Sequence, residues 1–368
     1  MNTAEKRATA GLWSIQGVGP VTLNEIRKRM GSLGELLEKP PATWAALFSW
    51  QGDAYQRLMA LPSLAAAADS VEAHCQTHHT RILFPGDPAF PERLEHIPDA
   101  PAMVFAFGDG AEAPPRRRLA IVGTRHPMPG VLGRVEDIAD EAASAGLGII
   151  SGAAVGIDQA AHRGALRAGG ETWAFMGCAL DQIDSGQREI SRAILDQGGT
   201  LFSEFPPGFR ANLNSFILRN RLISGSSDAV LVVRAPLKSG ALNTAENAIN
   251  QGRPLLVTAS DPWDRSAEGS NKLLKDGKAK LHLHLKDLWN ALGLTGSLSP
   301  QEFAPLDLND LSPTARVLFE RLGRGGSDFE TLQCDLPELT SGQISAALVE
   351  LEVFGAVLHK GCRRYEKR

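Results

Sequence analysis

The sequence predicts an α/β protein whose central part, residues 116–293, forms a doubly wound, mostly parallel β-sheet of the Rossmann-like class. Two observations support this prediction. Short apolar runs recur along this segment, and helical patterns lie between most of them. Because the strands of a parallel sheet are buried on both faces, they read as continuous apolar runs rather than as alternating ones. In such sheets, ligands bind beyond the carboxyl ends of the strands.

The apolar and helical patterns place the elements of this sheet in order along the chain. We expect strands at 119–122, 147–150, 172–176, 201–203, 229–233, 255–257 and 280–284. We expect helices at 131–145, 157–168, 188–197, 240–250 and 271–275, and a short helix that includes 219–221. Strands that alternate with helices in this way predict helices on both faces of the sheet.

Residues 1–78 are predicted to form a helical domain of the SAM or helix-hairpin-helix type. A Gly-Val-Gly-Pro turn at 17–20 precedes a helical pattern at 21–30, and further helices are expected at 44–59 and 63–78. Such a turn exposes backbone amides to phosphate in helix-hairpin-helix proteins, but Gly and Pro also interrupt helices without any binding role. Because only Arg27, Lys28 and Arg29 lie close to it, we favour a tight turn in a small helical bundle. Residues 79–115 are rich in proline and are interpreted as a connector with one strand at 102–107.

The C-terminal part of the chain is predicted to form a separate winged-helix domain. Residues 294–312 carry three acids, two prolines and no base, which is typical of a linker. In 313–368, helices are expected at 314–322, 327–334 and 341–354, followed by a hairpin that turns at Lys360-Gly361. The helix that would enter a major groove carries Glu350 and Glu352 and no base, so we expect an accessory or protein-contact module rather than a sequence-specific regulator.

Composition limits the possible partners and compartments. The 368-residue chain has a net charge of -4, and only 6% of its residues are aromatic, so any nucleic-acid contact must come from a local basic patch. The four cysteines are scattered without a Cys-x-x-Cys pair, which argues against a disulfide framework or a zinc site. The N-terminus lacks a signal-peptide core, and no apolar run reaches the roughly 18 residues that span a bilayer. We therefore expect a cytoplasmic protein without membrane insertion.

The segment from Phe205 to Ala248 is the strongest candidate for chemistry because it combines five basic residues with small-residue turns. Small residues between a strand and a helix leave backbone N–H groups open to an anion, and arginines match phosphate with paired donors. Similar turns follow the other strands, and the carboxyl ends of parallel strands share one edge of a sheet. The predicted phosphate-binding residues are Gly123, Thr124, Arg125, Ser151, Gly152, Gly156, Arg210, Arg219, Asn220, Arg221, Lys238, Ser239 and Gly240.

Other constellations are weaker candidates. The turn after the first strand is not Gly-x-Gly-x-x-Gly and no P-loop motif is present, so no nucleotide cofactor is predicted. Asp158 and His162 lie four residues apart on one helical face, where an acid–base pair is conceivable, but we favour a helix-capping carboxylate beside a packed histidine. His282 and His284 lack a third ligand, so no metal site is predicted.

Six motifs follow one another in a specific order. They are 122–125 (Val-Gly-Thr-Arg); 151–158 with Ala161-His162 and Ala165-Leu166; 203–206 (Ser-Glu-Phe-Pro); 216–223 (FILRNRLI); 239–245; and 269–271 (Gly-Ser-Asn). With these motifs, residues 117 to about 284 closely resemble the DNA-processing protein A family (DprA, also called Smf). The resemblance implies single-stranded DNA binding, homodimerisation and loading of RecA recombinase during natural transformation, without catalysis. The family's arginine after the first strand corresponds to Arg125, and a basic residue upstream of the Arg-Asn-Arg sequence corresponds to Arg210.

A rival hypothesis is a nucleoside monophosphate hydrolase of the lysine-decarboxylase-like type, which also has a Rossmann-like sheet. That class would need Pro-Gly-Gly-x-Gly-Thr-x-x-Glu in the turn that here reads KSGALNTAENA. The region of Thr244 lacks the paired glycines, and Glu246 is not in register with the catalytic glutamate. The hydrolase is therefore the secondary hypothesis.

Overall fold

The computed structural model describes residues 1–15, 17–45, 53–112, 117–293, 311–322, 327–353, 357–359 and 364–367. The chain divides into two compact units, Met1–Thr295 and Gly296–Arg368. Most of the predicted linker and the predicted turn at Lys360-Gly361 lie outside the described residues.

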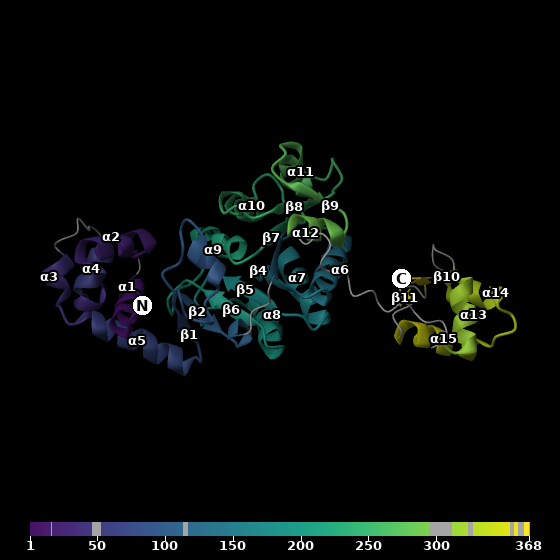
Figure 1. The fold of residues 1–368 in the computed structure, drawn as a ribbon, viewed down its shortest axis with the longest axis horizontal. Helices are drawn as coiled ribbons and strands as arrows, with labels where there is room; N and C mark the ends of the chain where they lie inside the picture. The colour runs from purple at the N-terminus through teal and green to yellow at the C-terminus, as the bar shows by residue number, and fades with distance from the viewer. Residues whose placement is uncertain are drawn as a thin grey trace. The chain divides into compact units, whose positions relative to one another are not determined.

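A nine-stranded sheet forms the centre of the first unit (Figure 1). The strands are β1 (Arg81–Leu83), β2 (Val104–Phe107), β3 (Arg117–Val122), β4 (Leu147–Ser151), β5 (Thr172–Met176), β6 (Thr200–Ser203), β7 (Ala229–Val232), β8 (Leu255–Thr258) and β9 (Lys280–His282). Their order across the sheet is β1-β2-β6-β5-β4-β3-β7-β8-β9, and all pairs among β3 to β9 are parallel. Every strand predicted for residues 116–293 is present, so the predicted mostly parallel α/β sheet is confirmed.

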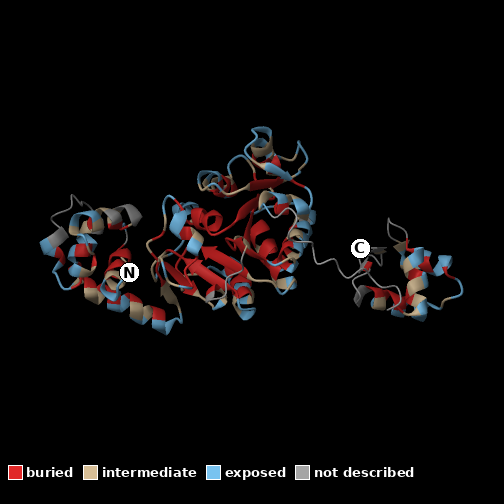
Figure 2. Cartoon of the chain, in the orientation of Figure 1, coloured by how far each residue is buried: buried red, intermediate tan, exposed pale blue. Residues whose placement is uncertain are grey.

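Helices cover both faces of this sheet. One face packs against α6 (Pro129–Ser144), α7 (Ile157–Arg167), α8 (Ser185–Asp196) and α12 (Leu285–Ala291), and the other against α9 (Leu213–Gly225), α10 (Gly240–Asn250) and α11 (Glu268–Lys275). Successive side chains of β3 point to opposite faces of the sheet, and those on both faces are apolar. Leu119 and Ile121 pack toward α6 and α7, whereas Ala120 and Val122 pack toward α9 and α10. The central strands β3 to β8 are accordingly almost entirely buried, whereas the helices also carry exposed residues (Figure 2).

The order of the strands creates a crevice at one point of the sheet. From β3 the chain proceeds through β4, β5 and β6 on one side, and then returns to β7 on the other side of β3. The loops that follow β3 and β7 therefore lead to helices on opposite faces of the sheet. A crevice at such a topological switch point is the usual ligand site of this architecture.

The N-terminal helices share a hydrophobic core with the first two strands. The helices are α1 (Thr3–Trp13), α2 (Pro20–Met30), α3 (Pro41–Ala45), α4 (Asp53–Met59) and α5 (Leu64–Thr77). Leu12 and Leu23 belong to the same buried cluster as Phe84 and Phe105, and the Trp13 indole N–H donates to the carbonyl of Glu204 at 2.5 Å. The segment 79–115, interpreted from the sequence as a connector, thus contributes two strands to the sheet. The strand expected at 102–107 is β2, which pairs antiparallel with β6.

The second unit contains three helices and a small antiparallel sheet. The helices are α13 (Pro313–Arg321), α14 (Phe329–Asp335) and α15 (Ser341–Val353). The strands β10 (Ser327–Asp328), β11 (Val357–His359) and β12 (Arg364–Lys367) pair in the order β10-β12-β11. Leu318, Leu332 and Leu348 lie in one buried cluster, so this unit has a core of its own. Across the described parts of both units, no helix has the length and apolar character needed to cross a membrane.

Candidate phosphate-binding cleft

A cleft of about 680 Å³ opens at the topological switch point, beyond the carboxyl ends of β3 and β7. Three segments form most of its wall: the end of β3 with its following loop, one face of α9, and the loop that leads from β7 into α10. The lining residues that were predicted from the sequence are Gly123, Thr124, Arg125, Arg219, Asn220, Lys238, Ser239 and Gly240. The predicted turns after β3 and β7 therefore meet at one edge of the sheet.

The N-terminus of α10 faces this cleft and provides a partial positive charge. Ser239 caps the helix, its hydroxyl accepting from the amide of Ala241 at 3.2 Å. Asn220 fixes the position of this helix start because its amide donates to the Gly240 carbonyl at 3.1 Å and to the side chain of Asn243 at 3.3 Å. Helix N-termini favour anions through free amides and the helix dipole.

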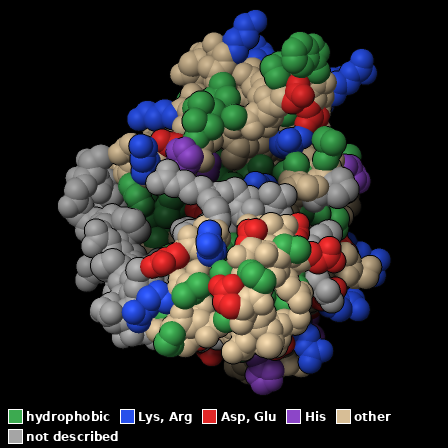
Figure 3. All heavy atoms as spheres, turned by 90° about the vertical axis from the view of Figure 1, so that its right-hand side faces the viewer, with side chains coloured by type: hydrophobic (Ala, Val, Ile, Leu, Met, Phe, Trp, Pro, Cys, Tyr) green, Lys and Arg blue, Asp and Glu red, His purple; other side chains and the backbone are tan. Residues whose placement is uncertain are grey.

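Two exposed basic side chains add full positive charges. The Arg125 guanidinium lies over the ring of Phe216, with 5.0 Å between the guanidinium carbon and the ring centroid. Lys238 is exposed at the opposite wall. Among the described residues neither side chain forms an ion pair, so both charges are available to a ligand. On the face drawn in Figure 3, Lys and Arg side chains lie among acidic and hydrophobic ones.

Arg219 lies beneath the cleft surface and carries a buried charge. It is 3% exposed, and its Nη1 donates to the Phe175 carbonyl at 2.7 Å. Burial lowers the pKa of Arg219 to about 10, an effect that the nearby Asp158 carboxylate opposes. A Cβ at position 152 would lie only 1.7 Å from Nη1 of Arg219. Only a glycine at this position therefore leaves room for the guanidinium where it lies.

Asp158 and Arg219 form a buried pair of opposite charges that also organises the turn after β4. The Asp158 carboxylate accepts from the Gly152 amide at 3.2 Å. Burial raises the pKa of Asp158, whereas Arg219 and the backbone hydrogen bonds act in the opposite direction. Gly156 has a φ of 98° and directly precedes the first residue of α7. A Cβ at this position would lie only 2.6 Å from the Thr124 carbonyl oxygen. Gly152 and Gly156 thus support the cleft from behind rather than line it.

The remaining predicted residues lie outside the cleft, for different physical reasons. The Ser151 hydroxyl is fully buried and donates to the Ile121 carbonyl at 2.6 Å, which ties β4 to β3. Arg210 is exposed on the segment before α9 but is not part of the cleft wall.

Arg221 corrects the expectation that the two arginines of α9 converge on this edge. Its guanidinium is 2.7 Å from the carboxylate of Glu204 and 2.9 Å from that of Asp99. Residues two apart on a helix point about 200° apart, so Arg219 and Arg221 cannot both face the cleft. Arg221 therefore fastens α9 to the end of β6.

Sequence reasoning missed the apolar part of the cleft wall. Leu213, Phe216 and Ile217 line it from α9, and Leu237 lines it from the loop before α10. Leu213 is 83% exposed and Leu237 is 50% exposed, and their grouping in one wall is more informative than a single exposed leucine. One helical face has the spacing of positions 213, 216, 217 and 220. The sequence could have indicated this shared face only if a helix as long as α9 had been expected. The cleft thus combines positive charge with exposed apolar surface.

His162 has the structural role favoured from the sequence. It is fully buried, and its Nδ1 lies 2.7 Å from the Thr172 hydroxyl, which itself donates to the Ile149 carbonyl. Burial, with the charges of Arg219 and Arg163, lowers the pKa of His162 to about 3, so the ring is neutral at physiological pH. Among the described residues no cluster of His, Cys, Asp and Glu side chains has the arrangement of a metal site.

Comparison with known proteins gives consistent matches. Residues 81–293 match the family model for DNA recombination-mediator protein A. The chain is 28% identical to protein Smf of Synechocystis sp., over 97% of each chain, and 33% identical to the DNA processing protein DprA of Bacillus subtilis, over 55% of this chain and 66% of that one.

Two solved structures share the fold. DNA processing protein A of Helicobacter pylori, described for its single-stranded DNA binding mode, is 30% identical, with a TM-score of 0.52 over 58% of this chain and 95% of that chain. DprA of Streptococcus pneumoniae is 24% identical, with a TM-score of 0.54 over 74% of this chain and 98% of that chain.

Proposed function

Because the chain belongs to the DNA recombination-mediator protein A family, we propose that it binds single-stranded DNA in the cleft between β3, β7, α9 and α10, without catalysing a reaction. The resemblance to DprA and Smf noted from the motifs is confirmed by the family match. The single observation that carries the proposal is the composition of the cleft. Two cations that form no ion pair within the described ranges, together with a helix N-terminus, suit phosphates, and exposed apolar side chains suit bases.

The proposal favours single strands over duplex for a physical reason. Bases in a duplex are stacked inside the helix, whereas single strands present both their phosphates and the flat faces of their bases. Phe216 beneath Arg125, together with Leu213 and Ile217, offers surface to such faces. Contacts with phosphates and with the flat faces of bases do not distinguish one base from another, so little dependence on sequence is expected.

Salt-dependent binding tests this function. Fluorescence anisotropy with labelled oligo-dT and a duplex of equal length should show tighter binding to oligo-dT. Affinity should fall with salt, because each phosphate neutralised on a single strand contributes about -0.7 to the slope of log K against log salt. Equal binding to duplex, or a slope near zero, would contradict the proposal.

The rival hydrolase has little support from the cleft. It would need a carboxylate that can reach a bound nucleotide, and Glu246 is exposed on α10 outside the cleft wall. Asp158 is the one carboxylate among the described lining residues, and it is held by the turn amides. Release of free base from nucleoside monophosphates, abolished by Glu246→Ala with oligo-dT binding intact, would favour the enzyme.

Further properties are proposed from family membership and sequence. We propose that the chain forms a homodimer, loads RecA recombinase onto the bound strand and acts in the cytoplasm. We also propose that the N-terminal helices form a SAM-like domain and that residues 313–368 form a winged-helix module for protein contacts. Domain boundaries near 78, 115, 293 and 312 belong to the same proposal.

A further inference from the structure

The loop that follows β8 presents a bare tryptophan side chain to solvent. Trp263 is 88% exposed, whereas Trp13, Trp173 and Trp289 are each less than 8% exposed. An indole is the largest apolar side chain, and leaving it in water contributes nothing to folding. Its exposure therefore requires another explanation.

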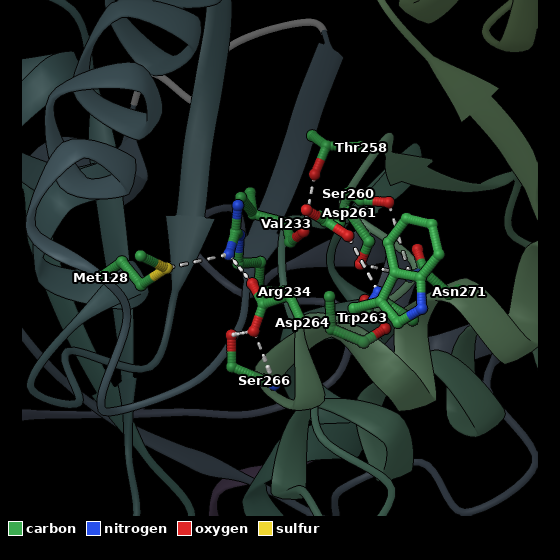
Figure 4. Close-up of polar contacts among 12 residues, drawn as sticks. Met128, Val233, Arg234, Thr258, Ser260, Asp261, Trp263, Asp264, Ser266 and Asn271 are labelled. Carbon is green, nitrogen blue, oxygen red and sulfur yellow. Dashed lines mark hydrogen bonds and ion pairs between the residues drawn. The ribbon is translucent and has the colours of Figure 1, made fainter.

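The backbone that carries Trp263 is held by hydrogen bonds on both sides (Figure 4). The Asp261 carboxylate accepts from the Trp263 amide at 2.9 Å, and Asn271 donates to the Asp261 carbonyl at 3.3 Å. Asp264 caps the next turn through the amide and hydroxyl of Ser266, at 2.8 and 2.7 Å. The indole is thus displayed from an anchored loop, which reduces the entropy lost when a ligand binds to it.

This loop lies on the same edge of the sheet as the proposed DNA cleft. β8 pairs in parallel with β7, so the loops after both strands emerge at the same edge. Arg234, which follows β7, contacts Asp264 of the loop and the Met128 sulfur at 3.9 Å, in the segment after β3 (Figure 4). Arg234 thereby links the loops after β3, β7 and β8 into one surface and neutralises Asp264.

We propose that Trp263 is a base-stacking platform that extends the single-strand path from the cleft toward β8. This inference rests on the proposed function. A flat, exposed, anchored indole on the sheet edge that also carries the cleft matches the way in which single-strand binders hold successive bases, and every base has a face that can stack. On a path from β7 to β8 the strand would pass Asp264, whose carboxylate is paired with Arg234 and therefore repels a phosphate less.

Oligo-dT and an abasic strand of equal length test this role in the full chain. Trp263→Ala should weaken oligo-dT binding about fivefold to hundredfold, and Trp263→Phe, which keeps an aromatic face, should restore most of the affinity. Binding to the abasic strand should be the same for wild type and Trp263→Ala, because no base is present to stack. Ile249→Ala, a change at another exposed apolar side chain outside the cleft, is the matched control and should bind oligo-dT like wild type.

The outcomes separate this inference from the proposed function. If wild type fails to bind oligo-dT, the proposed function itself is wrong. If wild type binds but Trp263→Ala binds equally well, or loses affinity for the abasic strand to the same extent, the stacking role is wrong. A changed oligomeric state of Trp263→Ala with unchanged oligo-dT affinity would also overturn it and assign the indole to a protein contact. The unfolding midpoint of each variant, which should match wild type, shows that the loop change leaves the fold intact.

Discussion

Replacing Arg221 by Ala is expected to lower the free energy of unfolding by about 3–5 kcal/mol, the usual cost of removing one partner of a buried ion pair. The Arg221 and Glu204 side chains are 8% and 7% exposed, and the pair joins α9 to the end of β6. Without the arginine, the Glu204 carboxylate stays buried with no cation to compensate it. Urea unfolding of the full chain measures the loss, and Arg192→Ala, which removes an exposed arginine of α8, should change stability by less than about 1 kcal/mol.

The pH dependence of this loss identifies its cause. Burial raises the pKa of Glu204, and Arg221 opposes that rise. The variant should therefore have a still higher Glu204 pKa in the folded state. A carboxyl pKa that is raised by folding gives stability at low pH that is lost as the pH rises through the folded pKa. The loss in free energy of unfolding caused by Arg221→Ala should thus be smaller at pH 5 than at pH 8. A loss that is independent of pH, or below about 1 kcal/mol, would show that the ion pair contributes little to stability.

Arg125→Ala is expected to weaken oligo-dT binding about tenfold to hundredfold. A hydrogen bond to a charged group contributes about 1.5–3 kcal/mol, and the exposed Arg125 guanidinium forms no ion pair within the described part of the chain. The Arg125 side chain is exposed, and its main contact among the residues that the structure describes is the Phe216 ring, so the unfolding midpoint should change little. Arg192→Ala again serves as control, because it removes the same charge away from the cleft.

Two results would contradict this role of Arg125. Unchanged oligo-dT affinity would show that the phosphate path avoids the loop after β3. Equal losses for Arg125→Ala and Arg192→Ala would show that only the overall charge of the protein matters.

The sequence predicts the cleft well where its position follows from parallel-sheet geometry. Gly123, Ser239 and Gly240 each follow a strand of the sheet, and the carboxyl ends of parallel strands meet at one edge. Their convergence requires only the correct assignment of the strands. The apolar runs are long enough, and different enough from the helical patterns, for that assignment to hold.

Other features depend on contacts between distant segments. The sequence predicts the strand at 102–107, but its place in the sheet depends on the pairing of β2 with β6. β1 is three residues long in a proline-rich segment, and it is defined by its pairing with β2. The Ser151 hydroxyl could equally have faced a ligand, and its bond to Ile121 becomes evident only when β3 and β4 are adjacent. Arg221 could be assigned to Glu204 only once α9 was known to pass the end of β6.

Photo-crosslinking with oligo-dT that carries 4-thiothymine tests the central claim most directly, because it locates the bound strand on the protein. The crosslinked peptides should come from residues 122–126, 213–220 and 236–244, the segments that line most of the cleft, and Arg125→Ala should reduce their yield. Crosslinks confined to residues 1–78 or 313–368, with none in these three segments, would contradict the account and place DNA binding outside the sheet edge.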